Sequence, residues 1–168
     1  MSLHYLIGDA TDPKIKPALI CHVNNDIGGW GRGFVIALSK RNNAPEEAYK
    51  KWHHDRISHG VEFKLGAVQI VKYADQVVVA NMIAQRDIRW DGKIPPIRYD
   101  ALKECLTSVF WWAKEKGYTV HCPRIGAVLS GGEWPIIEKI IKETMTVETY
   151  VYTIEEQKDR WPTNYETL

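Results

Sequence analysis

The chain has 168 residues, of which 45% are apolar and 26% are charged, and this composition is typical of one globular domain with its own core. Its formal net charge of +1 favours neither duplex nucleic acid nor an anionic membrane as a partner, although a local patch would suffice to bind a small anion. The three cysteines lie far apart, and no secretory signal or apolar run of membrane-spanning length is visible. We therefore expect a cytoplasmic protein with free thiols and without a metal ion or other cofactor.

Strands and helices alternate along the chain. Apolar runs predict strands at residues 3–7, 18–24, 65–73, 76–83, 119–122 and 147–154. Helical periodicity predicts helices at 34–41, from Pro45 onwards, at 99–116 and at 135–144, with Gly117 as the stop of the longest one. This alternation is typical of an α/β protein in which helices cover both faces of a mainly parallel sheet. We expect a single domain over residues 1–154, followed by a C-terminal extension at 155–168.

A polar segment at residues 85–97 interrupts this pattern. It contains Arg86, Arg89, Trp90 and two prolines, and it is longer than a plain connection between two elements. We expect this segment to form a flexible flap near a functional site.

The most informative stretch joins the second predicted strand to the first predicted helix. The strand ends in Asn24, Asn25 and Asp26, and four glycines follow within six positions, at 28, 29, 31 and 33. Glycines allow the backbone to approach a ligand closely, and the first free N–H groups of a helix attract anions. The polar side chains stand at the carboxyl end of a strand, where α/β sheets place their sites. The stretch indicates a sugar-phosphate site, with a purely structural glycine-rich turn as the alternative.

A second glycine-rich loop, at residues 123–133, follows the predicted strand 119–122. Two such loops leaving neighbouring strands could hold a diphosphate between them. The standard nucleotide motifs fail, because Phe34 or Ile36 breaks the dinucleotide spacing and Phe34-Val35 replaces the lysine and hydroxyl residue of a phosphate-binding loop. No known nucleophile motif is present either, so any catalysis would use a positioned water.

Four segments together resemble a macrodomain. They are Gly8-Asp9-Ala10-Thr11, the strand that leads into Asn24–Gly33, Pro123-Arg124-Ile125-Gly126, and Val151-Tyr152-Thr153-Ile154. Within that family the chain is most similar to the compact branch that holds terminal ADP-ribose protein glycohydrolase and ADP-ribose 1″-phosphate phosphatase. The resemblance runs from about Tyr5 to Ile154. It implies a three-layer α/β/α sandwich around a mixed, mainly parallel six-stranded sheet, with ADP-ribose in a cleft at the strand ends.

The resemblance also implies which residues contact ADP-ribose. Asp9, with Ala10 beside it, would accept a hydrogen bond from the adenine amino group, and Tyr152 would line the adenine pocket. Asn24, Asn25 and Asp26 would surround the distal ribose. Two loops would wrap the distal ribose and the diphosphate. They comprise Gly29, Trp30, Gly31, Arg32, Gly33 and Phe34 in the first loop, and Pro123, Ile125, Gly126, Ala127, Val128, Leu129, Ser130 and Gly131 in the second.

Two departures from the glycohydrolase pattern bear on catalysis. The catalytic lysine of that branch would fall at Ala84 or Gln85, and its catalytic aspartate at Ser130. A covalent mechanism that depends on the lysine is therefore not expected, whereas binding is untouched. If the protein is an enzyme, we expect Asn25 or Asp26 to orient a water that hydrolyses an ADP-ribosyl ester or ADP-ribose 1″-phosphate. His22 could also hold this water, but a histidine in mid-strand more often packs in the core.

Two other functions stay open. The protein could read ADP-ribose or ADP-ribosylated partners without cleaving them, which the loss of the lysine and the aspartate favours. Alternatively, it could bind nucleotides or RNA ends by stacking bases on Trp30 or Trp90, although the near-neutral net charge argues against nucleic acid.

Overall fold

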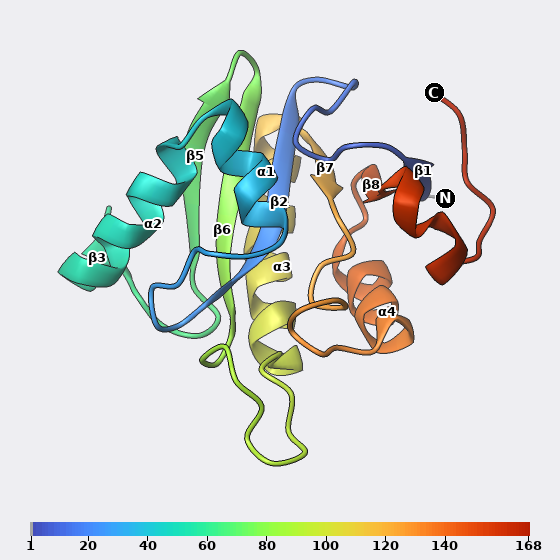
Figure 1. The fold of residues 1–168 in the computed structure, drawn as a ribbon. Helices are drawn as coiled ribbons and strands as arrows, with labels where there is room; N and C mark the ends of the chain where they lie inside the picture. The colour runs from blue at the N-terminus through green and yellow to red at the C-terminus, as the bar shows by residue number, and fades with distance from the viewer. Residues whose placement is uncertain (1) are drawn as a thin grey trace.

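The computed structural model describes residues 2–168, and its centre is a six-stranded sheet (Figure 1). The strand order is β1-β8-β7-β2-β6-β5. All neighbouring strands are parallel except β5 and β6, which are antiparallel. The strands are β1 (Leu3–Ile7), β2 (Ala18–Asn25), β5 (Val68–Ala74), β6 (Val77–Gln85), β7 (Thr119–Cys122) and β8 (Thr149–Thr153). The sheet is therefore mixed and mainly parallel, as predicted.

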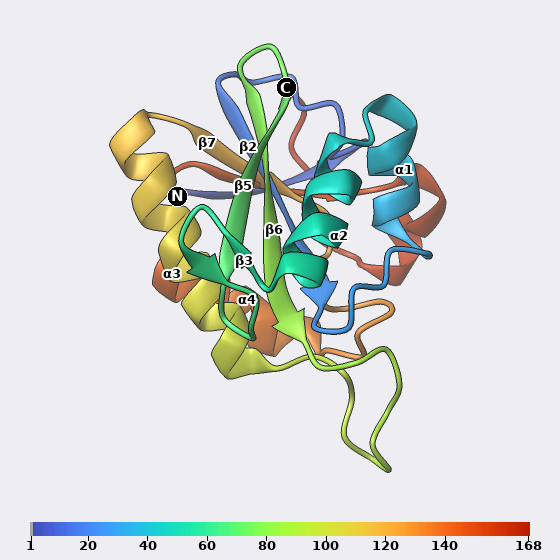
Figure 2. The ribbon, with the colours of Figure 1, turned by 90° about the vertical axis from the view of Figure 1, so that its left-hand side faces the viewer.

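Helices cover both faces of this sheet. α1 (Phe34–Arg41) and α2 (Ala44–Asp55) pack on one face, and α3 (Tyr99–Lys116) and α4 (Trp134–Thr144) pack on the other. The view along the sheet in Figure 2 separates the two helical layers. The predicted three-layer α/β/α sandwich is confirmed. Within residues 2–168, none of the helices has both the length and the apolarity needed to cross a membrane.

The central strands β2 and β6 are buried on both faces. In β2 only Val23 is less than fully buried, which explains why this segment is a continuous apolar run rather than an alternating one. Successive side chains enter different cores. Leu19 and Cys21 join the core beneath α3 and α4, whereas Ala18 and Ile20 join the core beneath α1 and α2.

The structure differs from the predicted elements at three places. The first is β5, which begins at Val68 rather than at residue 65. Residues 57–62 form a small hairpin, β3 (Ile57–Ser58) and β4 (Val61–Glu62), which was not predicted because two-residue strands leave no periodic pattern. β8 is shorter than the predicted strand at 147–154, and all five of its residues are buried. By contrast, α3 ends where predicted, because Gly117 adopts a left-handed φ of 76° and its N–H donates to the Ala113 carbonyl.

The residues after β8 pack back onto the sheet. They begin with a 3-10 helix, η1 (Glu155–Arg160), and later run beside β1, where the Glu166 N–H donates to the Tyr5 carbonyl at 2.8 Å. Leu6 and Glu166 also form an isolated parallel bridge. The C-terminal segment thereby covers the outer edge of β1, where the strand would otherwise present unpaired backbone groups.

Candidate functional site

The sheet opens between β2 and β7. β7 pairs with β2 only from Ala18 to Ile20, whereas β2 continues to Asn25. The connection leaving β2 leads to α1 on one face, and the connection leaving β7 leads to α4 on the opposite face. In α/β sheets, ligands bind at the carboxyl ends of the strands at such a point. Figure 1 shows the β2–α1, β6–α3 and β7–α4 loops together at this end of the sheet. We call the surface formed by residues 26–33, 86–98 and 123–133 the three-loop site.

The β2–α1 loop is folded around the side chain of Asn25. Its Oδ1 accepts hydrogen bonds from the N–H groups of Ile27 (3.1 Å) and Gly29 (2.9 Å), and its Nδ2 donates to the Gly29 carbonyl at 2.9 Å. The Tyr49 hydroxyl, on α2, donates to the Asn25 backbone carbonyl at 2.6 Å and lies 2.9 Å from Oδ1. The side-chain amide of Asn25 therefore already makes hydrogen bonds that hold the β2–α1 loop in shape.

Two glycines of this loop stand where a side chain would not fit. Gly28 has a φ of 79°, and an added Cβ would lie 2.5 Å from the imidazole of His53. Gly33 has a φ of 78°, and an added Cβ would lie 2.8 Å from Leu129 in the β7–α4 loop. The close approach of Gly33 to Leu129 means that the first and third loops touch each other.

α1, α3 and α4 begin at the three-loop site, and α3 has Asp100 in its first turn. Neither Gly33, which precedes α1, nor Glu133, which precedes α4, makes a side-chain capping hydrogen bond, and neither helix has an acidic residue in its first turn. The first N–H groups of a helix lack backbone partners and carry partial positive charge. The α1 end therefore provides donors for an anion. The α4 end provides fewer, because Pro135 has no N–H and the N–H groups of Ile136 and Ile137 already donate to the Glu133 carbonyl.

The β7–α4 loop is anchored by Arg124. Its guanidinium lies 4.8 Å from the ring centres of Tyr5 and Trp134 and 5.1 Å from that of Trp161, and its Nε donates to Thr153 Oγ1 at 3.0 Å. The side chain is buried, with 7% of its surface exposed. Arg124 thus ties the loop to β1, α4, β8 and the C-terminal segment at once.

The β6–α3 loop contacts both other loops. At its start, the Asp87 N–H donates to Asp26 Oδ1 at 2.7 Å, and the Ser130 hydroxyl donates to Gln85 Oε1. Further along, an added Cβ on Gly131 would lie 2.7 Å from the Trp90 ring. Gln85, which with Ala84 is one of the two positions proposed to match the lysine of the glycohydrolase branch, is therefore joined by a neutral hydrogen bond to Ser130, the position proposed to match its aspartate.

Asp9 lies at the end of β1, in the turn that follows it. Its Oδ1 accepts hydrogen bonds from the Thr11 N–H (2.9 Å) and hydroxyl (2.7 Å), and its Oδ2 lies 3.3 Å from the Arg41 guanidinium. Burial would raise the pKa of Asp9, but these hydrogen bonds and the charge of Arg41 outweigh it and lower the pKa. The carboxylate is therefore ionised at neutral pH, and half of the side chain stays exposed.

Tyr152 belongs to a small apolar cluster at the same end of the sheet. The cluster contains Ala10 and Tyr152, and Phe34 of α1 packs against it. The Tyr152 hydroxyl lies 2.8 Å from His121 Nδ1, and burial raises its pKa. Asp9, Ala10, Phe34 and Tyr152, which the resemblance assigns to one ligand, therefore come from three separate elements: the turn after β1, α1 and β8.

Buried acceptors without a partner lie on β2. His22 Nε2 is 2.6 Å from Asn81 Oδ1, and because the Asn81 amide nitrogen donates to Pro45 and Gln69, His22 must donate from Nε2. Its Nδ1 is then an acceptor, and within residues 2–168 neither this atom nor Asn24 Oδ1 has a hydrogen-bond partner. Burial lowers the pKa of His22 to about 4, so the ring is neutral. His22 is a packed core histidine, whereas Asn24 is the second-last residue of β2, just before the β2–α1 loop.

The interpretation of Trp30 as a base-stacking surface is wrong. Its ring is buried in the core beneath α1 and α2, packs on Tyr49, and donates from Nε1 to the Ser39 hydroxyl at 2.8 Å. Only its backbone can face a ligand. The sequence did not predict the structural importance of Tyr49 and Arg124. For Arg124 the available signal was its position inside the Pro-Arg-Ile-Gly motif.

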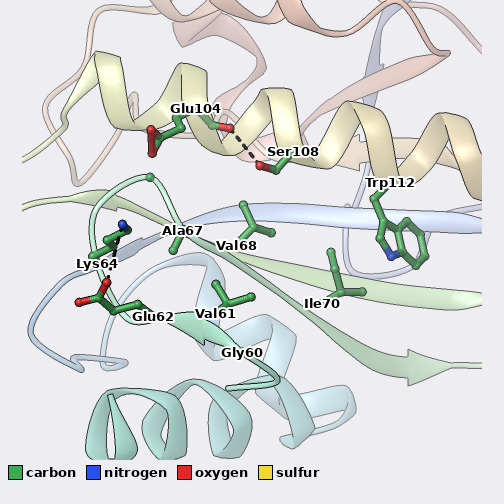
Figure 3. Close-up of a pocket in the computed structure, with 11 residues that line it drawn as sticks. Gly60, Val61, Glu62, Lys64, Ala67, Val68, Ile70, Glu104, Ser108 and Trp112 are labelled. Carbon is green, nitrogen blue, oxygen red and sulfur yellow. Dashed lines mark hydrogen bonds and ion pairs between the residues drawn. The ribbon is translucent and has the colours of Figure 1, made fainter. Parts of the chain in front are cut away.

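A groove of about 580 Å³ lies elsewhere, beside the antiparallel edge of the sheet. It is lined by the β3–β4 hairpin, β5 and α3, with Val61, Ile70 and Trp112 among its apolar residues and Glu104 on its rim (Figure 3). None of its lining residues belongs to the three-loop site. The groove lies beside the antiparallel edge strand β5 and not at the opening between β2 and β7, so it is not the site that the topology favours.

Comparisons with curated proteins and with solved structures find relatives of this chain. No family model matches the chain. Among curated proteins, chromodomain-helicase-DNA-binding protein 1-like from Mus musculus is 31% identical over 172 residues, and its counterpart from Danio rerio is 30% identical over 164 residues. These alignments cover 95% and 90% of the chain but only 18% and 15% of the relatives, so the chain spans less than a fifth of their length.

The similarity to solved structures extends over whole chains. A protein of unknown function from Bacteroides thetaiotaomicron is 46% identical, with a TM-score of 0.85, over 90% of this chain and 98% of that one. A macrodomain protein from Streptomyces coelicolor is 42% identical, with a TM-score of 0.79, over the same shares. A mutant macrodomain from Oceanobacillus iheyensis, solved with ADP-ribose, shares the fold at 17% identity and a TM-score of 0.68, over 94% of this chain and 87% of that one. The chain belongs to the macrodomain family.

Proposed function

We propose that the protein binds ADP-ribose at the three-loop site. The observation that carries this proposal is the contact between the first and third loops, at Gly33 and Leu129, next to the uncapped N-terminus of α1 and at the end of the strand that holds the unpartnered buried Oδ1 of Asn24. Free N–H groups at helix N-termini suit a diphosphate, and an amide without a partner suits a ribose hydroxyl. The membership of the macrodomain family supports the same ligand, because the O. iheyensis macrodomain was solved with ADP-ribose.

The proposed placement of the ligand follows the elements. The adenine lies near Asp9, Ala10 and Tyr152, where an ionised carboxylate can accept from the exocyclic amine. The diphosphate lies between the glycines of the first loop and residues 125–131 of the third. The distal ribose lies near Asn24 and Asp26, beneath the start of the β6–α3 loop. In this placement Asn25 does not contact the ligand, but it supports binding by holding the β2–α1 loop in shape.

A second candidate is hydrolysis at the distal ribose, of an ADP-ribosyl ester or of ADP-ribose 1″-phosphate. Asp26 favours it, because only its Oδ1 is engaged, by the Asp87 N–H, and no donor within residues 2–168 contacts its other oxygen. A free carboxylate oxygen can orient a water. Asn25 suits this role less well than Asp26, because its amide already makes the hydrogen bonds of the loop. The reader function is the alternative in which binding occurs without this step.

The binding proposal is tested by calorimetric titration with ADP-ribose, ADP, AMP and ribose. We expect ADP-ribose to bind more tightly than ADP or AMP. Asn24→Leu should lower the affinity for ADP-ribose about tenfold or more and leave that for AMP unchanged, yet it should not lower the melting temperature, because the buried amide has no partner to lose. Equal weak binding of AMP and ADP-ribose, or no binding, would refute the proposal.

The hydrolysis candidate is tested with ADP-ribose 1″-phosphate and a glutamate-linked ADP-ribosyl peptide. Asp26→Asn keeps an acceptor for the Asp87 N–H but removes the charge, so it should abolish turnover while the loop stays in place. Asn25→Ala should instead weaken binding by loosening the loop. Unchanged turnover in Asp26→Asn would exclude the mechanism, and binding without turnover in the wild type would support the reader.

A further inference from the structure

Large apolar side chains are exposed around the three-loop site. They are Ile27 in the first loop, Ile88, Trp90 and Ile94 in the second, and Val128 and Leu129 in the third, and each exposes between 40% and 55% of its surface. We call these six residues the apolar rim. Exposed apolar residues gathered on adjacent loops mark an interaction surface more often than scattered ones do.

The rim is a connected surface, because the loops that carry it touch one another. Leu129 meets Gly33, Trp90 meets Gly131, and Asp87 is hydrogen-bonded to Asp26. The second loop, between β6 and α3, resembles a hairpin, because isolated antiparallel bridges join Gln85 to Ile97 and Asp91 to Ile94. Figure 2 shows this loop projecting from the body of the domain. Its apolar residues are therefore presented outward, next to the proposed position of the distal ribose.

Cations accompany the rim. Arg32, Arg86, Arg89 and Lys93 are exposed on the first two loops, and none of them forms an ion pair in the described part of the chain. The exposed acids of these two loops are Asp87 and Asp91, and Asp87 already accepts a hydrogen bond from the N–H of Ile88. The third loop adds the exposed Glu133, so the surface combines apolar side chains with four exposed cations against three exposed acids.

We propose that the apolar rim docks the polypeptide to which ADP-ribose is attached, an acidic segment with apolar side chains. This inference rests on the proposed binding of ADP-ribose. Exposed apolar side chains on projecting loops bind the side chains of a peptide by excluding water. A protein attached through the distal ribose would leave the site beside Asp26, and the start of the projecting loop is hydrogen-bonded to that residue. Unpaired cations select an acidic segment by charge complementarity.

The test compares free ADP-ribose with the same group fixed through a non-hydrolysable link to a short glutamate- and leucine-rich peptide. We expect the wild type to bind the conjugate about tenfold more tightly than free ADP-ribose. Ile88→Ser and Lys93→Glu should remove most of this gain. Neither residue is among those proposed to contact adenine, diphosphate or ribose, so the affinity for free ADP-ribose should not change. Ile57→Ser and Lys72→Glu are matched controls, because they are exposed residues of the same types on β3 and β5, and they should change neither affinity.

The outcomes separate the two proposals. No binding of free ADP-ribose overturns the proposed function and the docking surface with it. Equal affinities for the free and conjugated ligands overturn the docking surface alone. A lysine- and leucine-rich conjugate that binds as tightly as the glutamate-rich one overturns the choice of an acidic segment.

Discussion

The replacement of Arg124 by lysine tests how the third loop is held. Lysine keeps the positive charge but loses the planar guanidinium, which lies against Tyr5, Trp134 and Trp161 and donates to Thr153. The change therefore removes geometry rather than charge, at a residue that is almost fully buried.

The expected cost follows from these contacts. A desolvated cation–π contact contributes about 0.5–2 kcal/mol, and a hydrogen bond from a charged group about 1.5–3 kcal/mol. Lysine can restore one of these contacts but not all of them, so we expect a loss of about 2–4 kcal/mol in the free energy of unfolding. For a chain of this size, the melting temperature should fall by roughly 5–15 °C.

Arg160→Lys is the matched control. Arg160 also lies over the Trp161 ring, at 5.3 Å, but it is exposed, so its replacement should cost less than about 0.5 kcal/mol. Urea unfolding followed by circular dichroism measures both variants. If Arg124→Lys is no more costly than Arg160→Lys, the aromatic cage around Arg124 does not hold the loop.

Two further predictions concern buried groups. Burial lowers the pKa of both His22 and His121 to about 4 from 6.5, so between these pH values the unfolded chain binds protons that the native chain does not. The two neutral histidines therefore contribute fully to the free energy of unfolding above pH 6.5. This contribution, about 3 kcal/mol for each histidine, is lost as the pH falls towards 4. Urea midpoints at pH 7 and pH 4.5 should show this loss, and His121→Gln should reduce it; equal midpoints would contradict the assignment. Tyr49→Phe removes the hydroxyl that holds Asn25. We expect it to destabilise the fold by about 1–2 kcal/mol and to weaken ADP-ribose binding several-fold. Unchanged binding in calorimetry would show that the β2–α1 loop keeps its shape without this hydroxyl.

The sequence contained enough information for the layers of the fold, because strong local patterns specify them. The continuous apolar run of β2 predicts a strand that is covered on both faces. The apolar face of α3 predicts a helix, and Gly117 after it predicts where the helix ends. The hairpin at 57–62 escaped prediction because its strands have two residues each and most of it is exposed. Local periodicity carries no information about such short pairings.

The contacts within the candidate site depend on side chains that are distant in sequence, so local patterns could not reveal them. Trp30 stands among glycines and polar residues, yet its ring turns inward because α2 supplies Tyr49 as a packing partner. Gln85 and Ser130 are 45 residues apart, and their hydrogen bond exists only because β6 and β7 both flank β2. A resemblance can assign residues to a ligand, but only the folded chain shows which of their atoms are already engaged.

This distinction limits the chemistry that the site can perform. Gln85 and Ser130 are neutral and bonded to each other, and Asn25 is bound by its own loop, so Asp26 is the group proposed to orient a water beside the distal ribose. A carboxylate that orients a water, with preorganised N–H donors, contributes on the order of 10²–10³-fold each. That is sufficient for a labile ester or phosphate but small beside the barrier of an N-glycosidic bond. Hydrolysis at this site would therefore be confined to linkages with a good leaving group, and stable linkages would be read rather than cleaved.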